Sequence, residues 1–180
     1  MISLLDPSET PSLSSLRVPG DFYCVLRAPG LLAGMRYPPP RTPWAEIHAI
    51  GGRHVVRLTP LVQAYDPSPL ATAHAVELAE LVGGRWPPDV AVEEARIAEA
   101  ARIVTRLVSS GQGVVVHCVA GTGRTGTVIG CVLRGLGLPA RDVLRYLDGL
   151  NRRRGNPGWP ESVWQFEVVE RFGAPQTPTA

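Results

Sequence analysis

Ten residues near the middle of the chain, HCVAGTGRTG at positions 117–126, constrain the fold more than any other segment. They follow an apolar run at 114–116 and open an apolar segment at 128–138 that has helical character. This pattern predicts a buried strand that leads through a glycine-containing loop into the N-terminus of a helix. Backbone N–H groups point into such a loop and the helix dipole adds positive potential, so the segment is a predicted anion-binding site.

Two side chains give this predicted site a chemistry. Cys118 lies at the base of the loop, where positive potential favours the thiolate, the reactive form of a cysteine. Arg124 follows six residues later, and its planar guanidinium matches two phosphoryl oxygens. The combination predicts nucleophilic attack on phosphorus. The plainer alternative is a buried structural cysteine beside a turn.

The pattern His-Cys-x-x-Gly-x-x-Arg-Thr-Gly resembles the signature of the cysteine-dependent protein phosphatases, both tyrosine-specific and dual-specificity. From Phe22 to Phe172 the order of segments is similar to that of the small atypical dual-specificity phosphatases. The resemblance implies an α/β, three-layer phosphatase-like fold, in which a central, mostly parallel, twisted sheet of four or five strands is flanked by helices. It also implies a phosphocysteine intermediate on Cys118 and a reaction that needs no metal or other cofactor.

The resemblance assigns further roles within the loop. His117 would orient the loop and support the ionised thiol, although a lone histidine is more often a satisfied core residue. Thr125 would donate a hydrogen bond to the thiolate, or it caps the following helix. The phosphate-binding backbone would be that of Val119, Ala120, Gly121, Thr122, Gly123 and Arg124.

A carboxyl group must protonate the leaving oxygen and later activate a water molecule. Asp89 is the candidate, because it lies 29 residues before Cys118 in a Trp-Pro-Pro-Asp segment that resembles the acid loop of the same phosphatases. The alternative role for Asp89 is the N-cap of a helix predicted over 91–108. Asp66, which lies 52 residues before Cys118, is a second candidate for the acid.

Two segments near the C-terminus carry open alternatives. Glu161 and Gln165 belong to a stretch similar to one that supports the active-site loop or positions water in the resembling phosphatases, and they also suit a helix N-terminus. Gln165 is the candidate supporting residue. The arginines at 152–154 suit the C-terminal end of a helix, or they contact a second phosphate or an acidic flank of the substrate.

The variable loop positions carry no charge, whereas the phosphoinositide phosphatases that share this signature often have lysines there. We therefore expect a phosphomonoester on tyrosine, or on tyrosine and serine or threonine, as the substrate. A small molecule, nucleotide or phosphoinositide phosphatase with the same chemistry is the alternative. A non-catalytic phosphate-binding module and a sulfur-transfer or arsenate-reducing enzyme are further alternatives.

Length and composition set the frame for these expectations. A chain of 180 residues suits one phosphatase domain, expected over 20–172, with a loose N-terminal arm at 1–19 and a flexible tail at 173–180. The net charge of +2 argues against nucleic acid or a membrane as a partner and leaves the oligomeric state open. Three cysteines and no signal peptide or long apolar run favour the reducing cytoplasm.

Local patterns predict the remaining elements. Strands are expected at 22–26 and 54–58, and helices at 42–51, 91–108, 139–151 and 160–172. Residues 70–82 are rich in alanine and favour a helix more than a strand. The strand that precedes the acid loop in the resembling phosphatases would then fall at 80–82 or at 85–86, which leaves the topology of 59–88 open.

Overall fold

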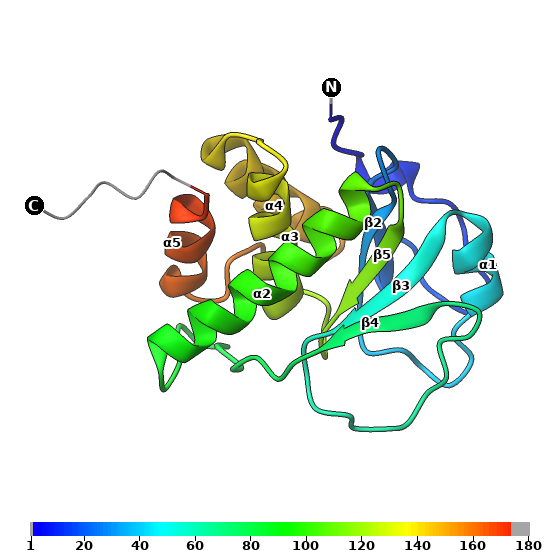
Figure 1. The fold of residues 1–180 in the computed structure, drawn as a ribbon, viewed down its shortest axis with the longest axis horizontal. Helices are drawn as coiled ribbons and strands as arrows, with labels where there is room; N and C mark the ends of the chain where they lie inside the picture. Colours follow the sequence, from blue (N-terminus) through cyan, green and yellow to red (C-terminus); the bar gives the residue numbers. More distant parts are fainter. Residues whose placement is uncertain (1, 174–180) are drawn as a thin grey trace, which may run out of the picture.

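A five-stranded sheet in the order β1-β2-β5-β3-β4 forms the centre of the protein, whose computed structural model describes residues 2–173 (Figure 1). The strands are β1 (Phe22–Leu26), β2 (Leu32–Met35), β3 (Gly52–Arg57), β4 (Ala71–Ala75) and β5 (Gly113–His117). Only β1 is antiparallel to its neighbour, and β2, β5, β3 and β4 run parallel. The expected mostly parallel α/β sheet is confirmed.

The central strand β5 is buried on both faces, as its valine run predicts. Val114 and Val116 belong to the apolar cluster beneath one set of helices, and Val115 belongs to the cluster on the opposite face. Successive side chains of a strand point to opposite faces, so this alternation anchors β5 between two apolar layers. The loop that follows β5 therefore begins at a fixed position.

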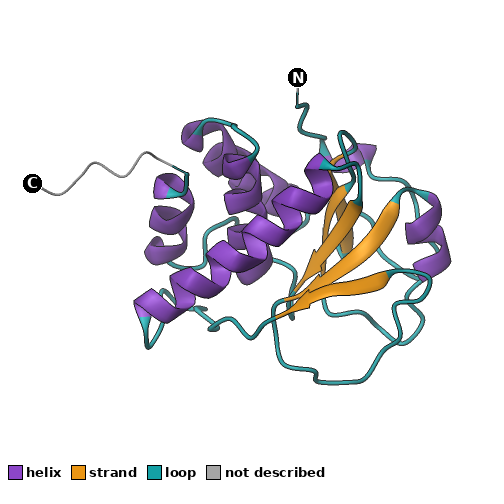
Figure 2. Cartoon of the chain, in the orientation of Figure 1, coloured by secondary structure: helices purple, strands orange, loops and turns teal. Residues whose placement is uncertain are grey.

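The helices cover the two faces unequally (Figure 2). α1 (Trp44–Ala49) lies on one side of the sheet, and four longer helices lie on the other. The four are α2 (Val90–Ser109), α3 (Gly123–Gly135), α4 (Ala140–Arg153) and α5 (Val163–Arg171), and a short 3-10 helix, η1 (Pro7–Glu9), precedes the sheet. Between residues 2 and 173, none of the helices is long and apolar enough to span a bilayer.

The N-terminal segment differs from the loose arm expected for residues 1–19. Leu5, Leu13 and Leu16 are buried in the cluster that also contains residues of α1. The Leu5 N–H donates to the carbonyl of Val25, 3.0 Å away. These leucines gain burial against a sheet face that the single short helix α1 leaves partly open, which outweighs the local preference of a serine- and proline-rich segment for disorder. Residue 1 and residues 174–180 of the expected tail lie outside the described residues.

The prediction of a helix over 70–82 is wrong. Residues 71–75 form β4, which pairs in parallel with β3 from His54 opposite Ala71 to Arg57 opposite Ala75. Helix propensity is a weak preference, and the ladder to β3 overrides it. The strand between 59 and 88 is therefore β4, and no strand forms at 80–82 or 85–86.

Candidate active site

The loop between β5 and α3 has the geometry of an anion-binding site. His117 ends β5, Cys118 follows with only 2% of its surface exposed, and α3 begins at Gly123. Within the described part of the chain, the backbone N–H groups of 119–122 have no acceptor. Unpaired N–H groups at a helix N-terminus favour a bound anion.

Arg124 lies in the first turn of α3 and is 9% exposed. Its guanidinium contacts the Thr59 hydroxyl at 3.5 Å, the carbonyl of Leu78 at 3.4 Å and the Glu80 carboxylate at 3.5 Å. Each of these contacts is longer than a normal hydrogen bond to a guanidinium. The planar group is therefore held in place while its donors still lack a strong acceptor.

Two buried side-chain donors fix the orientation of the Gly121 carbonyl. The Tyr23 hydroxyl and Arg154 Nη1 both donate to this oxygen, each at 2.9 Å. The Arg154 guanidinium also lies 3.9 Å above the Tyr23 ring. In a trans peptide unit the C=O and the following N–H point in opposite directions, so this pair of bonds aims the Thr122 N–H away from Tyr23 and Arg154.

Two glycines of the loop are required by close packing. Gly121 has φ of 71°, and a Cβ at this position would lie 2.5 Å from the Met35 carbonyl oxygen. A Cβ at Gly126 would lie 2.6 Å from Nε1 of Trp159. These close contacts explain why residues 121 and 126 of the loop are glycines.

His117 is buried between two polar partners. Its Nε2 lies 2.6 Å from the Tyr65 hydroxyl and its Nδ1 lies 3.2 Å from the Cys118 carbonyl oxygen. Burial lowers the pKa of His117 to about 4, so the ring is neutral at neutral pH. In this state Nδ1–H donates to the carbonyl and Nε2 accepts from Tyr65. Both the supporting role and the core role expected for His117 are compatible with these contacts.

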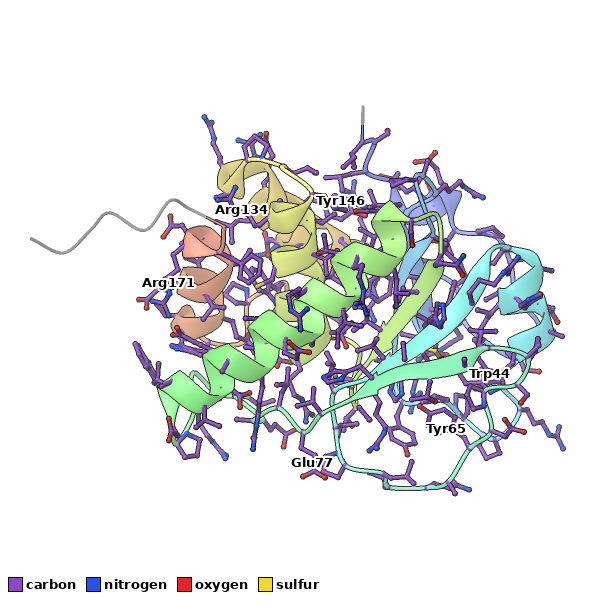
Figure 3. All side chains as sticks on the ribbon, viewed as in Figure 1. Trp44, Tyr65, Glu77, Arg134, Tyr146 and Arg171 are labelled. Carbon is purple, nitrogen blue, oxygen red and sulfur yellow. The ribbon has the colours of Figure 1, made fainter. Side chains whose placement is uncertain are left out.

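An aromatic cluster holds Tyr65 against this histidine. Tyr65 stacks on Trp44 and meets Tyr37 edge-on, with 5.8 Å between ring centroids in both pairs. Figure 3 shows Trp44 and Tyr65 next to each other beside α1. A helix and a loop that are distant in sequence from position 117 therefore fix the orientation of its side chain.

Thr125 and Gln165 lie beside the loop on its helical side. The Thr125 hydroxyl is buried and has no hydrogen-bond partner among residues 2–173, so the expected capping bond is not formed. Gln165 is 1% exposed, and its Oε1 accepts from the Glu161 N–H at 2.8 Å. Together with Ser162 it forms a capping box at the start of α5, as the helix alternative predicted.

Glu161 places a carboxylate at the N-terminus of α3. Burial raises its pKa, whereas Arg124 and the Gly123 N–H favour the ionised form. A Cβ at Gly123 would overlap this carboxylate. Three carboxyl groups therefore lie close to Arg124, namely those of Glu161, Glu80 and the buried Glu93.

Neither of the two predicted acids has a hydrogen bond or ion pair with Arg124 or with residues 117–126 in the described part of the chain. Asp89 is exposed and caps α2, where its carboxylate accepts from the Val92 N–H at 3.0 Å. In Figure 1 α2 begins at the lower left, whereas β5 ends near the centre of the molecule. Asp66 is exposed, and hydrogen bonds from Ser68 lower the pKa of its carboxyl. Thus the alternative role of Asp89, a helix N-cap, is the one with a visible contact.

The arginines at 152–154 all have partners within the chain. Arg152 pairs with Asp148 and Arg153 with Asp6, each at 3.0 Å. Besides Gly121, Arg154 donates to Asn151 and to the carbonyls of residues 19 and 20. Sequence patterns gave no sign that Arg154 and Tyr23 meet at Gly121, because each is far from position 121 along the chain.

Comparison with known proteins agrees with this geometry. A family model described as a polymorphic toxin system DSP-PTPase phosphatase matches residues 88–137. The structure of Tk-PTP in its active form is 26% identical and has a TM-score of 0.57, with 78% of this chain and 90% of that chain covered.

Two further structures share the fold at lower identity. DUSP15 is 18% identical with a TM-score of 0.60, and 84% of this chain and 87% of that chain are covered. The core catalytic domain of the PP-IP phosphatase SIW14 from S. cerevisiae is 16% identical with a TM-score of 0.54, covering 78% of this chain and 80% of that chain. At these identities the likeness concerns the fold alone.

Proposed function

Since the chain is a cysteine-dependent phosphatase of the dual-specificity family, we propose that it removes phosphate from phosphotyrosine and from phosphoserine or phosphothreonine in proteins. Cys118 is the nucleophile and Arg124 holds the transferred group. The three described cysteines are all free and buried, which suits a reducing compartment, and we place the protein in the cytoplasm.

The reaction has two steps on one sulfur atom. The Cys118 thiolate attacks phosphorus, an S–P bond forms, and the bond from phosphorus to the leaving oxygen breaks. Water then attacks phosphorus, the S–P bond breaks, and inorganic phosphate and the thiolate are released. Arg124 and the N–H groups of 119–122 stabilise the charge that spreads over the non-bridging oxygens. The buried Thr125 hydroxyl donates to the thiolate as it leaves.

One observation carries this proposal. A buried guanidinium that makes only long contacts lies six residues after a buried cysteine, beside backbone N–H groups that have no acceptor among the described residues. A dianionic phosphoryl group supplies the acceptors that both the guanidinium and the N–H groups lack. The site is thus matched to a tetrahedral oxyanion.

The residues around the loop favour a phosphate monoester on a protein as the substrate. Ala120 and Thr122 line a surface groove together with Gly83, Trp159 and Glu161. This groove is partly open to solvent, which leaves room for the phosphorylated side chain of a protein. The carboxylate of Glu161 disfavours a ligand with several phosphates by like-charge repulsion.

A second candidate is a small molecule with more than one anionic group. Arg17, Arg36 and Arg154 line a hollow that reaches Val119 and Ala120 of the loop, and Asp21 offsets part of their charge. A second phosphate of such a molecule would lie there. The fold shared with SIW14, a PP-IP phosphatase, is compatible with this alternative.

Hydrolysis of p-nitrophenyl phosphate tests the chemistry. We expect activity that is unaffected by a chelator, inhibited by vanadate and abolished in Cys118→Ser. Activity that requires added Mg²⁺, or that persists in Cys118→Ser, contradicts the mechanism. A panel of phosphopeptides, nucleotides and inositol phosphates then separates the two candidates, and we expect the highest kcat/KM with phosphotyrosine peptides.

A further inference from the structure

We propose that Glu80, and not Asp89, is the acid that protonates the leaving oxygen. This inference rests on the proposed function, because only a phosphoryl transfer to Cys118 creates an oxygen that needs this proton. It replaces an aspartate expected from the sequence with a glutamate that the fold brings to the site.

The segment that carries Glu80 is fixed on both sides. After β4, the Leu78 N–H donates to the Leu58 carbonyl at 3.3 Å, and the Leu78 carbonyl lies 3.4 Å from Arg124 Nη1. The Ala79 N–H donates to Oε1 of Glu93 at 2.6 Å, and Glu93 is 4% exposed. Glu80, the next residue, is therefore held at a fixed position next to Arg124.

At that place the Glu80 carboxylate lies at the outer edge of the site. Its Oε1 is 3.5 Å from Arg124 Nη2, and its side chain is 63% exposed. The guanidinium is expected to hold non-bridging oxygens of the phosphoryl group, so a carboxyl beside it lies next to the bridging oxygen as well.

Three other acids do not meet these conditions. Glu93 lies close to Arg124, but it is only 4% exposed and its Oε1 accepts from the Ala79 N–H. The carboxylate of Asp89 is engaged by the Val92 N–H, and Asp89 lines a hollow with Leu78, Ala79 and Arg96 but with no residue of the 117–126 loop. Glu161 faces the Gly123 N–H at the start of α3, on the helical side of the loop, where an anion is held rather than released.

The proton balance closes over the two steps. In the first, the Glu80 carboxyl gives its proton to the leaving oxygen as the P–O bond breaks and the S–P bond forms, leaving a carboxylate. In the second, this carboxylate takes a proton from the attacking water as the O–P bond forms and the S–P bond breaks. The enzyme ends with a protonated Glu80 and a Cys118 thiolate.

Two substrates of different leaving group test the assignment. Phenol is a weaker acid than p-nitrophenol, so phenyl phosphate depends on a proton donor more than p-nitrophenyl phosphate does. We expect Glu80→Gln to lower kcat on phenyl phosphate about 100-fold and on p-nitrophenyl phosphate much less, with KM nearly unchanged. The basic limb of its kcat–pH profile should also disappear.

A matched control lies on the same segment. Glu77→Gln makes the same chemical change at an exposed side chain that points away from the ribbon, as labelled in Figure 3, and wild-type kinetics are expected. Vanadate inhibition of Glu80→Gln at the wild-type concentration shows that the loop is intact.

Three outcomes overturn the assignment. Wild-type kcat of Glu80→Gln on phenyl phosphate removes Glu80 from the reaction. The same leaving-group dependence in Asp89→Asn or Glu161→Gln, and not in Glu80→Gln, moves the role to that residue. A wild-type protein without activity, or an active Cys118→Ser, refutes the proposed function itself, and the role of Glu80 falls with it.

Discussion

The Tyr23 hydroxyl and the Gly121 carbonyl form a buried 2.9 Å hydrogen bond across 98 residues of sequence. Arg154 Nη1 shares the same acceptor, so a strand at one edge of the sheet and the end of α4 both hold one peptide group of the loop. Because the carbonyl is fixed, the Thr122 N–H on the other side of that peptide is fixed too. A bond outside the loop thereby determines the direction of a donor within it.

Removing the Tyr23 hydroxyl should weaken anion binding. In Tyr23→Phe we expect vanadate inhibition to weaken about 5-fold and the free energy of unfolding to fall by about 1 kcal/mol, the usual contribution of one such bond. Inhibition constants and urea unfolding measure the two effects.

Tyr146→Phe is the matched control for Tyr23→Phe. The Tyr146 hydroxyl also donates to a carbonyl, that of Leu5, at 2.9 Å, and among the described residues no hydrogen bond joins it to the 117–126 loop. A similar loss of stability with unchanged vanadate inhibition is expected. Equal vanadate inhibition in both variants would show that the Tyr23 bond is only structural.

Arg154 should be far more important for stability than its neighbour Arg152. Arg154→Met removes the charge and leaves the carbonyl of Gly121 and the side chain of Asn151 without this donor. A loss of about 3 kcal/mol in the free energy of unfolding is expected, as for other buried charged groups that are removed from their partners.

The control for Arg154→Met is Arg152→Met, which breaks an exposed ion pair with Asp148. Surface pairs of this kind contribute about 1 kcal/mol or less, so unfolding in urea should be nearly unchanged. If both variants lose the same stability, the buried network around Arg154 does not hold the loop.

His117 should make the protein less stable in acid. Its pKa in the folded protein is about 4, below the ordinary 6.5, so between these values only the unfolded chain takes up the proton. Stability due to the neutral ring is therefore complete above pH 6.5 and falls by about 3 kcal/mol on approaching pH 4. Urea unfolding at pH 7 and pH 4 should show this loss in the wild type and a smaller one in His117→Gln. Equal losses in the two proteins would contradict it.

Local patterns predicted the parts of the site that are continuous in sequence. The valine run at 114–116, the loop and the start of α3 occupy consecutive positions, and a strand, a turn and a helix are each specified by neighbours along the chain. The helices α2 to α5 followed from the same periodicity, whereas the sheet class was implied by the resemblance to the cysteine-dependent phosphatases. The anion-binding loop itself was therefore predictable from the sequence.

Contacts between distant segments were not predictable in this way. The alanines of 71–75 favour a helix locally, and only the partner strand β3 makes them a strand. Asp89 is favoured by a local pattern, the Trp-Pro-Pro-Asp segment 29 residues before Cys118, whereas the distance of Glu80 from Arg124 depends on where β4 ends. The same holds for Tyr23, Tyr65 and Arg154, whose partners lie far away in sequence.

Gly121 tests how much of the loop depends on close packing rather than on backbone freedom. Gly137 has φ of 93° and a Cβ there would meet nothing within 4 Å, whereas at Gly121, with φ of 71°, it would lie 2.5 Å from the Met35 carbonyl oxygen. An alanine at either position bears the left-handed backbone penalty of about 1–2 kcal/mol.

Gly137→Ala should lose that amount of stability in urea unfolding and keep wild-type activity. Gly121→Ala should lose more stability, because Met35 belongs to β2 and its backbone cannot move without breaking the ladder to β5. The activity of Gly121→Ala on p-nitrophenyl phosphate should fall about 100-fold or more, because the Thr122 N–H is displaced. Equal stability losses with activity retained in both variants would show that the loop tolerates a Cβ against β2, and that the carbonyl bonds from Tyr23 and Arg154 do not set the direction of its donors.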